Sequence, residues 1–178
     1  IYFKLQSFVF MPVFGLNNGM VPIIAYNYGA GHKDRVIKTI KHSVAYGVGI
    51  MFAGLLAMHI FPAQLMRMFD AEESLIAIGA PALETISLSF VFAGFCIVAG
   101  SVFQALGNGV YSMIVSVARQ MCVLLPVAKL LSLSGEVTLI WWAFPIAELA
   151  SVLLTSYFLV RIYRKVICHI GEPVVQDA

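Results

Sequence analysis

Four stretches of this sequence are long enough to cross a lipid bilayer and carry almost no charge. The ranges 5–32 and 43–66 contain no Asp, Glu, Lys or Arg, and the ranges 74–118 and 137–160 contain a single acidic residue each. A bilayer core of about 30 Å is crossed by about 20 helical residues at a rise of about 1.5 Å each. The sequence therefore predicts a polytopic membrane protein.

The overall composition supports this prediction and excludes other classes. Hydrophobic residues make up 61% and charged residues 11% of the 178 residues, whereas a soluble domain is about half apolar and about a quarter charged. The net charge of +2 offers no basic face for nucleic acid, which is not an expected partner. The three cysteines form no CxxC pair and the four histidines no HxxxH pair, so we expect no metal and no cofactor.

Turn signals divide the charge-poor stretches into helices. The sequence Gly107-Asn108-Gly109 is a strong turn signal that splits the longest stretch, and a polar turn at 132–135 precedes the last one. We expect an all-α fold, a polytopic membrane helix bundle of five transmembrane helices at about 5–29, 43–65, 76–106, 110–131 and 137–162, followed by a tail at 169–178.

Basic residues near helix ends predict the orientation of the bundle. One end holds Lys33, Arg35, Lys38, Lys41, Arg161, Arg164 and Lys165, and the other holds Lys4, Arg67 and Lys129. We therefore expect a multi-pass protein of the cell membrane whose C-terminus is cytoplasmic. Because Ile1 already lies in apolar sequence without an initiating Met, we also expect further sequence upstream.

Three charged residues are predicted to lie within the membrane, where a charge must face protein or water. Arg119 and Glu148 fall near the middle of consecutive, antiparallel helices, so their side chains are expected at the same depth. They form either a structural ion pair or a relay for a proton or cation. Glu84 has no basic residue three or four positions away, so it is either an exposed carboxylate or a cation-coupling group.

Amide side chains are concentrated in the first predicted helix, which also contains two prolines. Prolines free backbone carbonyls, which neighbouring amides can satisfy or which can line a cavity. The candidates for lining a cavity are Gln6, Asn17, Asn18 and Asn27 in this helix, and Gln104 and Gln120 further along the chain. Phe10 and Phe14 are expected to face lipid or to pack against other helices.

Four motifs occur in an order and spacing that resemble those of a known family. They are the range 22–31 (PIIAYNYGAG) before a basic run, the range 103–107 (FQALG), Arg119-Gln120 followed by Pro126, and the range 142–148 (WAFPIAE). Together they resemble the MATE (multidrug and toxic compound extrusion) family, and within it the bacterial MepA/DinF-like branch. The similarity covers nearly the whole chain.

The resemblance implies a fold and a function. MATE proteins have twelve helices in two six-helix lobes, of which this chain would supply helices eight to twelve, most of the second lobe. The implied activity is export of cationic, amphipathic compounds in exchange for Na⁺ or H⁺ by alternating access. The implied partners are membrane lipids, small cationic organic substrates and the missing N-terminal part of the same transporter. Glu84, Glu148 and Arg119 are the candidates for cation coupling, and Glu84 lies on the helix that matches helix ten, where one Na⁺-linked branch carries an acid.

Three other functions stay open at this point. A lipid-linked oligosaccharide flippase of a related fold would need a cationic cavity, for which only Arg119 is a candidate. A membrane-embedded enzyme would need a catalytic constellation at one depth, but the spans contain no Asp, and His59 lies near a helix end. A purely structural subunit would leave Glu84 unexplained. We therefore expect a transporter and not an enzyme.

Overall fold

The computed structural model describes residues 2–69, 72–133 and 135–171, and in these ranges every regular element is a helix. The elements are α1 (Tyr2–Gly29), α2 (Lys33–Ile60), α3 (Pro62–Arg67), α4 (Glu73–Ser87), α5 (Phe90–Ala105), α6 (Gly109–Val117), the π-helix η1 (Ala118–Leu124), α7 (Leu125–Ser132), α8 (Val137–Ile140), α9 (Ala143–Lys165) and the 3-10 turn η2 (Ile167–His169). By length and composition, four continuous helical stretches can cross a membrane, and α4 with α5 adds a fifth span that is bent. The predicted all-helical membrane fold is confirmed.

Glycines in the left-handed region end two of the helices. Gly31 after α1 has a φ of +73°, and Gly107 after α5 has a φ of +77°. At the second turn, the Asn108 N–H donates to the Phe103 carbonyl at 2.8 Å, the bond that closes a Schellman motif. Side chains with a Cβ disfavour this conformation, so glycine is suited to both turns. The turn predicted at 107–109 is confirmed.

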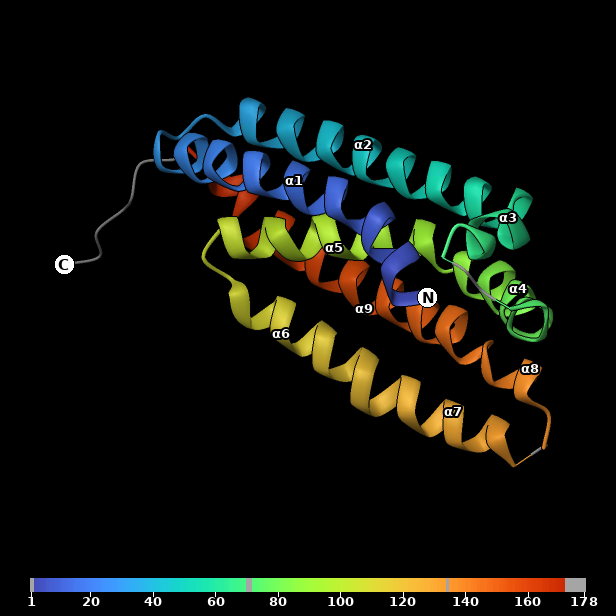
Figure 1. Cartoon of the computed structure of the whole chain (residues 1–178). Helices are drawn as coiled ribbons and strands as arrows, with labels where there is room; N and C mark the ends of the chain where they lie inside the picture. Colours follow the sequence, from blue (N-terminus) through green and yellow to red (C-terminus); the bar gives the residue numbers. More distant parts are fainter. Residues whose placement is uncertain (1, 70–71, 134, 172–178) are drawn as a thin grey trace.

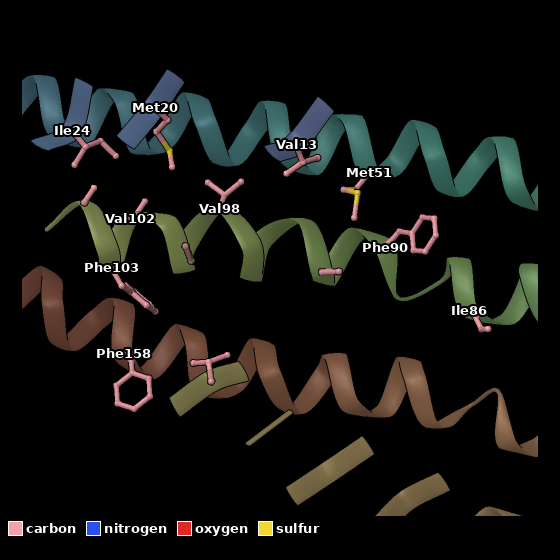
Figure 2. Packing of buried hydrophobic residues seen from close by; sticks show 14 of the residues in the cluster. Val13, Met20, Ile24, Met51, Ile86, Phe90, Val98, Val102, Phe103 and Phe158 are labelled. Atoms are coloured by element: carbon pink, nitrogen blue, oxygen red, sulfur yellow. The ribbon is translucent and has the colours of Figure 1, made fainter. Parts of the chain in front are cut away.

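Helix α5 forms the centre of the bundle. It contacts α1 and α2 on one side and α9 on the other (Figure 1). Val98 and Val102 of α5 pack toward α1 and α2, whereas Phe103 points toward Phe158 of α9 (Figure 2). The Tyr111 ring completes this contact, since it stacks on Phe158 with ring centroids 4.6 Å apart.

Small residues allow α2 and α5 to approach closely. A Cβ on Gly47 would lie 2.6 Å from the Val98 Cγ2, and one on Gly94 would lie 2.8 Å from the Met51 Cγ. Neither distance is possible for a real methyl group without movement of the facing side chain. Close approach at small residues is how helices associate in lipid, where the hydrophobic effect gives them no preference for one another.

The span predicted at 76–106 is not one straight helix. It bends by 50° between α4 and α5. At the bend, the Ser87 hydroxyl donates to the Glu84 carbonyl at 2.9 Å, and the Ser89 hydroxyl donates to the Ile86 carbonyl at 2.6 Å. Serine hydroxyls that bond to nearby carbonyls compete with the helical ladder, and they account for the bend.

Helices α6, η1 and α7 form one outer layer of the bundle (Figure 1). All three contact α9, and across the range 109–132 only Val115 is buried. Large apolar side chains such as Met121 and Leu125 are exposed on this layer. Exposed apolar side chains are what a helix in contact with lipid tails requires.

Candidate functional site

A cavity of about 490 Å³ lies between α1, α5, α9 and the α6–η1 stretch. Most of its polar lining comes from amide and hydroxyl side chains. The polar side chains are Gln6, Asn17 and Asn18 of α1, Ser101 and Gln104 of α5, Ser112 and Ser116 of α6, Arg119 of η1, and Ser151 and Thr155 of α9. Residues from four separate parts of the sequence therefore form one polar space inside an otherwise apolar bundle.

One face of α1 supplies a wall of this cavity. Gln6, Phe10, Phe14 and Asn17 all line it and are spaced four, four and three residues apart, which places them on one face of a helix. Asn17 is only 6% exposed, and its side-chain oxygen has no hydrogen-bond partner among the described residues. A buried acceptor without a donor is costly, so the hydrogen bonding of Asn17 is incomplete among the described residues.

The ion pair predicted between the last two spans is confirmed. Arg119 Nη1 donates to Glu148 Oε1 at 2.6 Å. The Glu148 side chain is 9% exposed and the Arg119 side chain 39%, so the carboxylate lies among protein atoms while the guanidinium borders the cavity. The other carboxylate oxygen, Glu148 Oε2, is buried and has no partner among the described residues. A buried charge in this position depends on its partner.

The π-helix η1 positions Arg119 and was not predicted. It spans seven residues and is followed by Pro126 near the start of α7. Proline has no N–H to donate, and its ring clashes with the carbonyl of the preceding turn, so the ordinary helical ladder cannot continue through this point. A wider π turn relieves this conflict, and π segments are frequent at functional sites. Ser112, Ser116 and Arg119 all line the cavity.

Other lining residues were not predicted to border a cavity. Phe10 and Phe14 were expected to face lipid or to pack, and Phe10 does pack edge-to-face on Phe90, with ring centroids 5.3 Å apart. Both rings also line the cavity. Their spacing from Gln6 and Asn17 on one helical face was the signal that could have placed them there. Cys96 also lines the cavity, and the Thr155 hydroxyl lies 3.6 Å from its sulfur. A single cysteine in an apolar run gives no such signal.

Three of the predicted site residues lie away from this cavity. Glu84 is half-buried on α4, its carboxylate forms no hydrogen bond or ion pair among the described residues, and it is not part of the cavity lining. Gln120 is exposed and is also absent from the lining. Asn27 lines a different hollow, between α1 and α2. The structure therefore brings together Gln6, Asn17, Asn18, Gln104, Arg119 and Glu148, but not these three.

Comparisons with known proteins agree with this fold. The MatE family model matches residues 1–130. The multidrug export protein MepA of Staphylococcus haemolyticus is 25% identical over 166 residues, which are 93% of this chain and 36% of that protein. MepA of Staphylococcus aureus is 26% identical over 149 residues, which are 83% of this chain and 32% of that protein. The chain thus spans about a third of the length of the curated relatives it matches.

Two solved structures are similar to this chain. One is the MATE multidrug transporter DinF-BH, with a TM-score of 0.81, 32% identity, and coverage of 92% of this chain and 36% of that one. The other is an inward-facing multidrug resistance MATE family transporter of the MOP superfamily, also with a TM-score of 0.81; at 16% identity it supports the fold alone. It covers 91% of this chain and 38% of that one. On the family match, the relatives and the fold, this membrane protein belongs to the MatE family of transporters.

Proposed function

We propose that the chain forms part of a multidrug efflux transporter that exports cationic, amphipathic compounds in antiport with Na⁺ or H⁺ by alternating access. The polar cavity between α1, α5, α6 and α9 is the single observation that carries this proposal. A volume of about 490 Å³ falls within the range of about 300–1,000 Å³ that is usual for small-molecule sites. The proposal is further supported by relatives that are named as multidrug export proteins.

The lining of the cavity suits an amphipathic cation. Phe10 and Phe14 offer aromatic faces, which attract cations and bury apolar surface. The Asn17 side chain lies in the same wall, and its unpartnered oxygen would accept a hydrogen bond from an ammonium group once the amide turns toward the cavity. An organic cation in this space would therefore meet aromatic rings and an amide side chain along the same wall.

We propose Glu148 as the first candidate for coupling transport to a cation. Its carboxylate holds Arg119 through one oxygen and leaves the other oxygen without a partner among the described residues. A proton or Na⁺ bound to this carboxylate would weaken the ion pair and free Arg119, which borders the cavity. The occupancy of the carboxylate would thereby change the charge that faces the substrate. Glu84 is the second candidate, because it is half-buried without a bonding partner among the described residues.

We further propose that the protein lies in the cell membrane with the basic end of the bundle in the cytoplasm. Lys33, Arg35 and Lys38 lie in the first two turns of α2. This end of α2 is close to the segment after α9, since Lys33 Nζ donates to the Cys168 carbonyl of η2 at 2.8 Å. The partners that follow from this proposal are membrane lipids, cationic organic substrates and the N-terminal part of a complete MATE transporter. Transport, and not catalysis, is the role that such an assembly would serve.

The test compares two phenylalanines of α1 in the protein expressed from its complete coding sequence. Phe14→Ala removes an aromatic ring from the cavity, whereas Phe8→Ala removes an exposed ring that does not line it. With a fluorescent organic cation as substrate in proteoliposomes, we expect Phe14→Ala to raise KM about 10-fold, because a cation–π contact contributes about 1–2 kcal/mol. Phe8→Ala should transport as the wild type does. Equal effects of the two variants would contradict the proposal.

A further inference from the structure

A second hollow lies between α1 and α2, and it is basic at one end and apolar along the rest. Its volume is about 620 Å³. Arg35, Lys38 and His42 of α2 line the basic end, and their spacing of three and four residues places them on one face of the helix. The floor deeper in the span includes Gly15 and Gly19 of α1. Figure 1 shows the two helices running side by side along their length. We call this hollow the α1–α2 groove.

The length of the groove matches one leaflet of a bilayer. Asn27, Gly19 and Gly15 all line it, and the twelve residues from Gly15 to Asn27 rise about 18 Å along α1. Half of a bilayer core is about 15 Å. A Cβ built on Gly15 or on Gly19 would meet no atom within 4 Å, so the strip above these glycines is open. An extended acyl chain fits such a strip.

The basic end of the groove carries charges that no described residue neutralises. Neither Arg35 nor Lys38 forms an ion pair with any described residue, although Asp34 lies on the same turn. Both side chains are exposed, and they lie in the first two turns of α2. Cations in this position attract anionic lipid headgroups.

A buried polar atom in the same groove lacks a partner. Asn27 is 7% exposed, and its amide nitrogen donates to the Ile23 carbonyl at 2.8 Å. Its side-chain oxygen is buried and has no hydrogen-bond partner among the described residues. Such an acceptor is destabilising unless a donor reaches it. Because this oxygen is also shielded from solvent, a ligand hydroxyl at the basic end would supply that donor only after the Asn27 side chain turns toward the groove.

We propose that the α1–α2 groove is a binding site for one anionic phospholipid. Its phosphate binds Arg35 and Lys38, and one acyl chain lies over Gly19 and Gly15. The Asn27 amide turns toward the groove and accepts from a headgroup hydroxyl. The site is in the leaflet at the basic end of the bundle. It is separate from the polar cavity, so lipid binding does not depend on the transport function proposed above.

The experiment measures lipid retained by the purified protein, expressed from its complete coding sequence. Native mass spectrometry in detergent with added phosphatidylglycerol or phosphatidylcholine gives an apparent Kd for each lipid. We expect the wild type to prefer phosphatidylglycerol. The double variant Arg35→Ala/Lys38→Ala should weaken phosphatidylglycerol binding about 30-fold, since each cation contributes about a factor of five to the attraction. Raising the ionic strength should weaken the wild-type preference as well.

Matched controls separate this site from general attraction to a basic surface. Arg164→Ala/Lys165→Ala removes two cations of α9 that lie outside the groove, and it should leave phosphatidylglycerol binding within twofold of the wild type. Gly19→Leu fills the open strip and should weaken binding of both lipids. Gly49→Leu adds the same side chain at an open position of α2 outside the groove, and it should leave the binding of both lipids unchanged.

Three results would overturn the proposal. The first is a wild type that retains no phosphatidylglycerol, because another segment then covers the groove. The second is equal retention of the two lipids, which would show that the basic end does not select charge. The third is an equal loss of binding in the Arg35/Lys38 and Arg164/Lys165 variants, which would show an unspecific basic surface.

Discussion

Removing Arg119 should destabilise the protein more than neutralising Glu148 does. The reason is the unequal burial of the two side chains, which are 39% and 9% exposed. Arg119→Met leaves the Glu148 carboxylate buried with no partner on either oxygen, a loss of about 3–5 kcal/mol. Glu148→Gln leaves a guanidinium that still reaches the cavity. We therefore expect the free energy of unfolding to fall by only about 1.5–3 kcal/mol, the contribution of one hydrogen bond to a charged group.

A double-mutant cycle measures the interaction itself. The free energy of unfolding is obtained by titrating the purified protein in detergent with sodium dodecyl sulfate. The Arg119→Met/Glu148→Gln variant should be more stable than the sum of the single losses by about 2 kcal/mol, because each single change already removes the contact. Additivity within about 0.5 kcal/mol would refute the reasoning, as would a larger loss from Glu148→Gln than from Arg119→Met.

An exposed pair in the same protein provides the control. Arg67 and Glu73 lie 3.0 Å apart, as close as an ordinary salt bridge, but their side chains are 61% and 78% exposed. Water screens such a pair, and exposed pairs contribute about 0.2–1 kcal/mol. Its coupling energy should therefore be well below that of Arg119 and Glu148. Equal coupling energies would mean that burial does not strengthen the inner pair.

Three further changes test the role of Glu84 and the packing of α2. Glu84→Gln removes a candidate cation-coupling carboxylate, so it should lower cation-driven export in proteoliposomes without lowering expression. Unchanged export would mean that Glu84 is a surface carboxylate with no part in coupling. Gly54→Ala would place a Cβ 2.1 Å from the Val9 Cγ1 and should destabilise the protein by about 1–3 kcal/mol in the same detergent titration. Gly49→Ala enters open space and should stabilise it by about 0.5–1 kcal/mol, and a loss of stability there would contradict the packing described.

The spans and the ion pair could be predicted because they follow from rules that act along one helix. Stretches with almost no charge indicate the spans. The bilayer disfavours charge along every spanning helix, however the helices pack against one another. Counting residues from the helix ends placed Arg119 and Glu148 at one depth, and the 2.6 Å contact agrees. The turn at Gly107 could be predicted because glycine readily adopts the positive φ that the turn has.

The other features depend on contacts between helices or on local competition for backbone carbonyls. The bend before Ser89 arises because hydroxyls compete with the helical ladder, and most serines in helices cause no such bend. The π turn before Pro126 is one of several ways to accommodate a proline. Phe10 and Phe14 were assigned to lipid or packing, because one helix alone does not reveal which of its faces meets a cavity.

Reaction of an engineered thiol with a charged reagent tests most directly whether water and substrate enter the polar cavity. The background is a variant in which Cys96, Cys122 and Cys168 are replaced by Ser. In it, Ser116→Cys puts a thiol on the cavity wall. Leu153→Cys puts a thiol at an apolar position of α9 that is 74% exposed. A membrane-impermeant methanethiosulfonate cation should modify the first quickly and the second hardly at all, and an exported dye should slow the first reaction. If Ser116→Cys reacts no faster than Leu153→Cys, water does not enter the cavity and it is not a transport route.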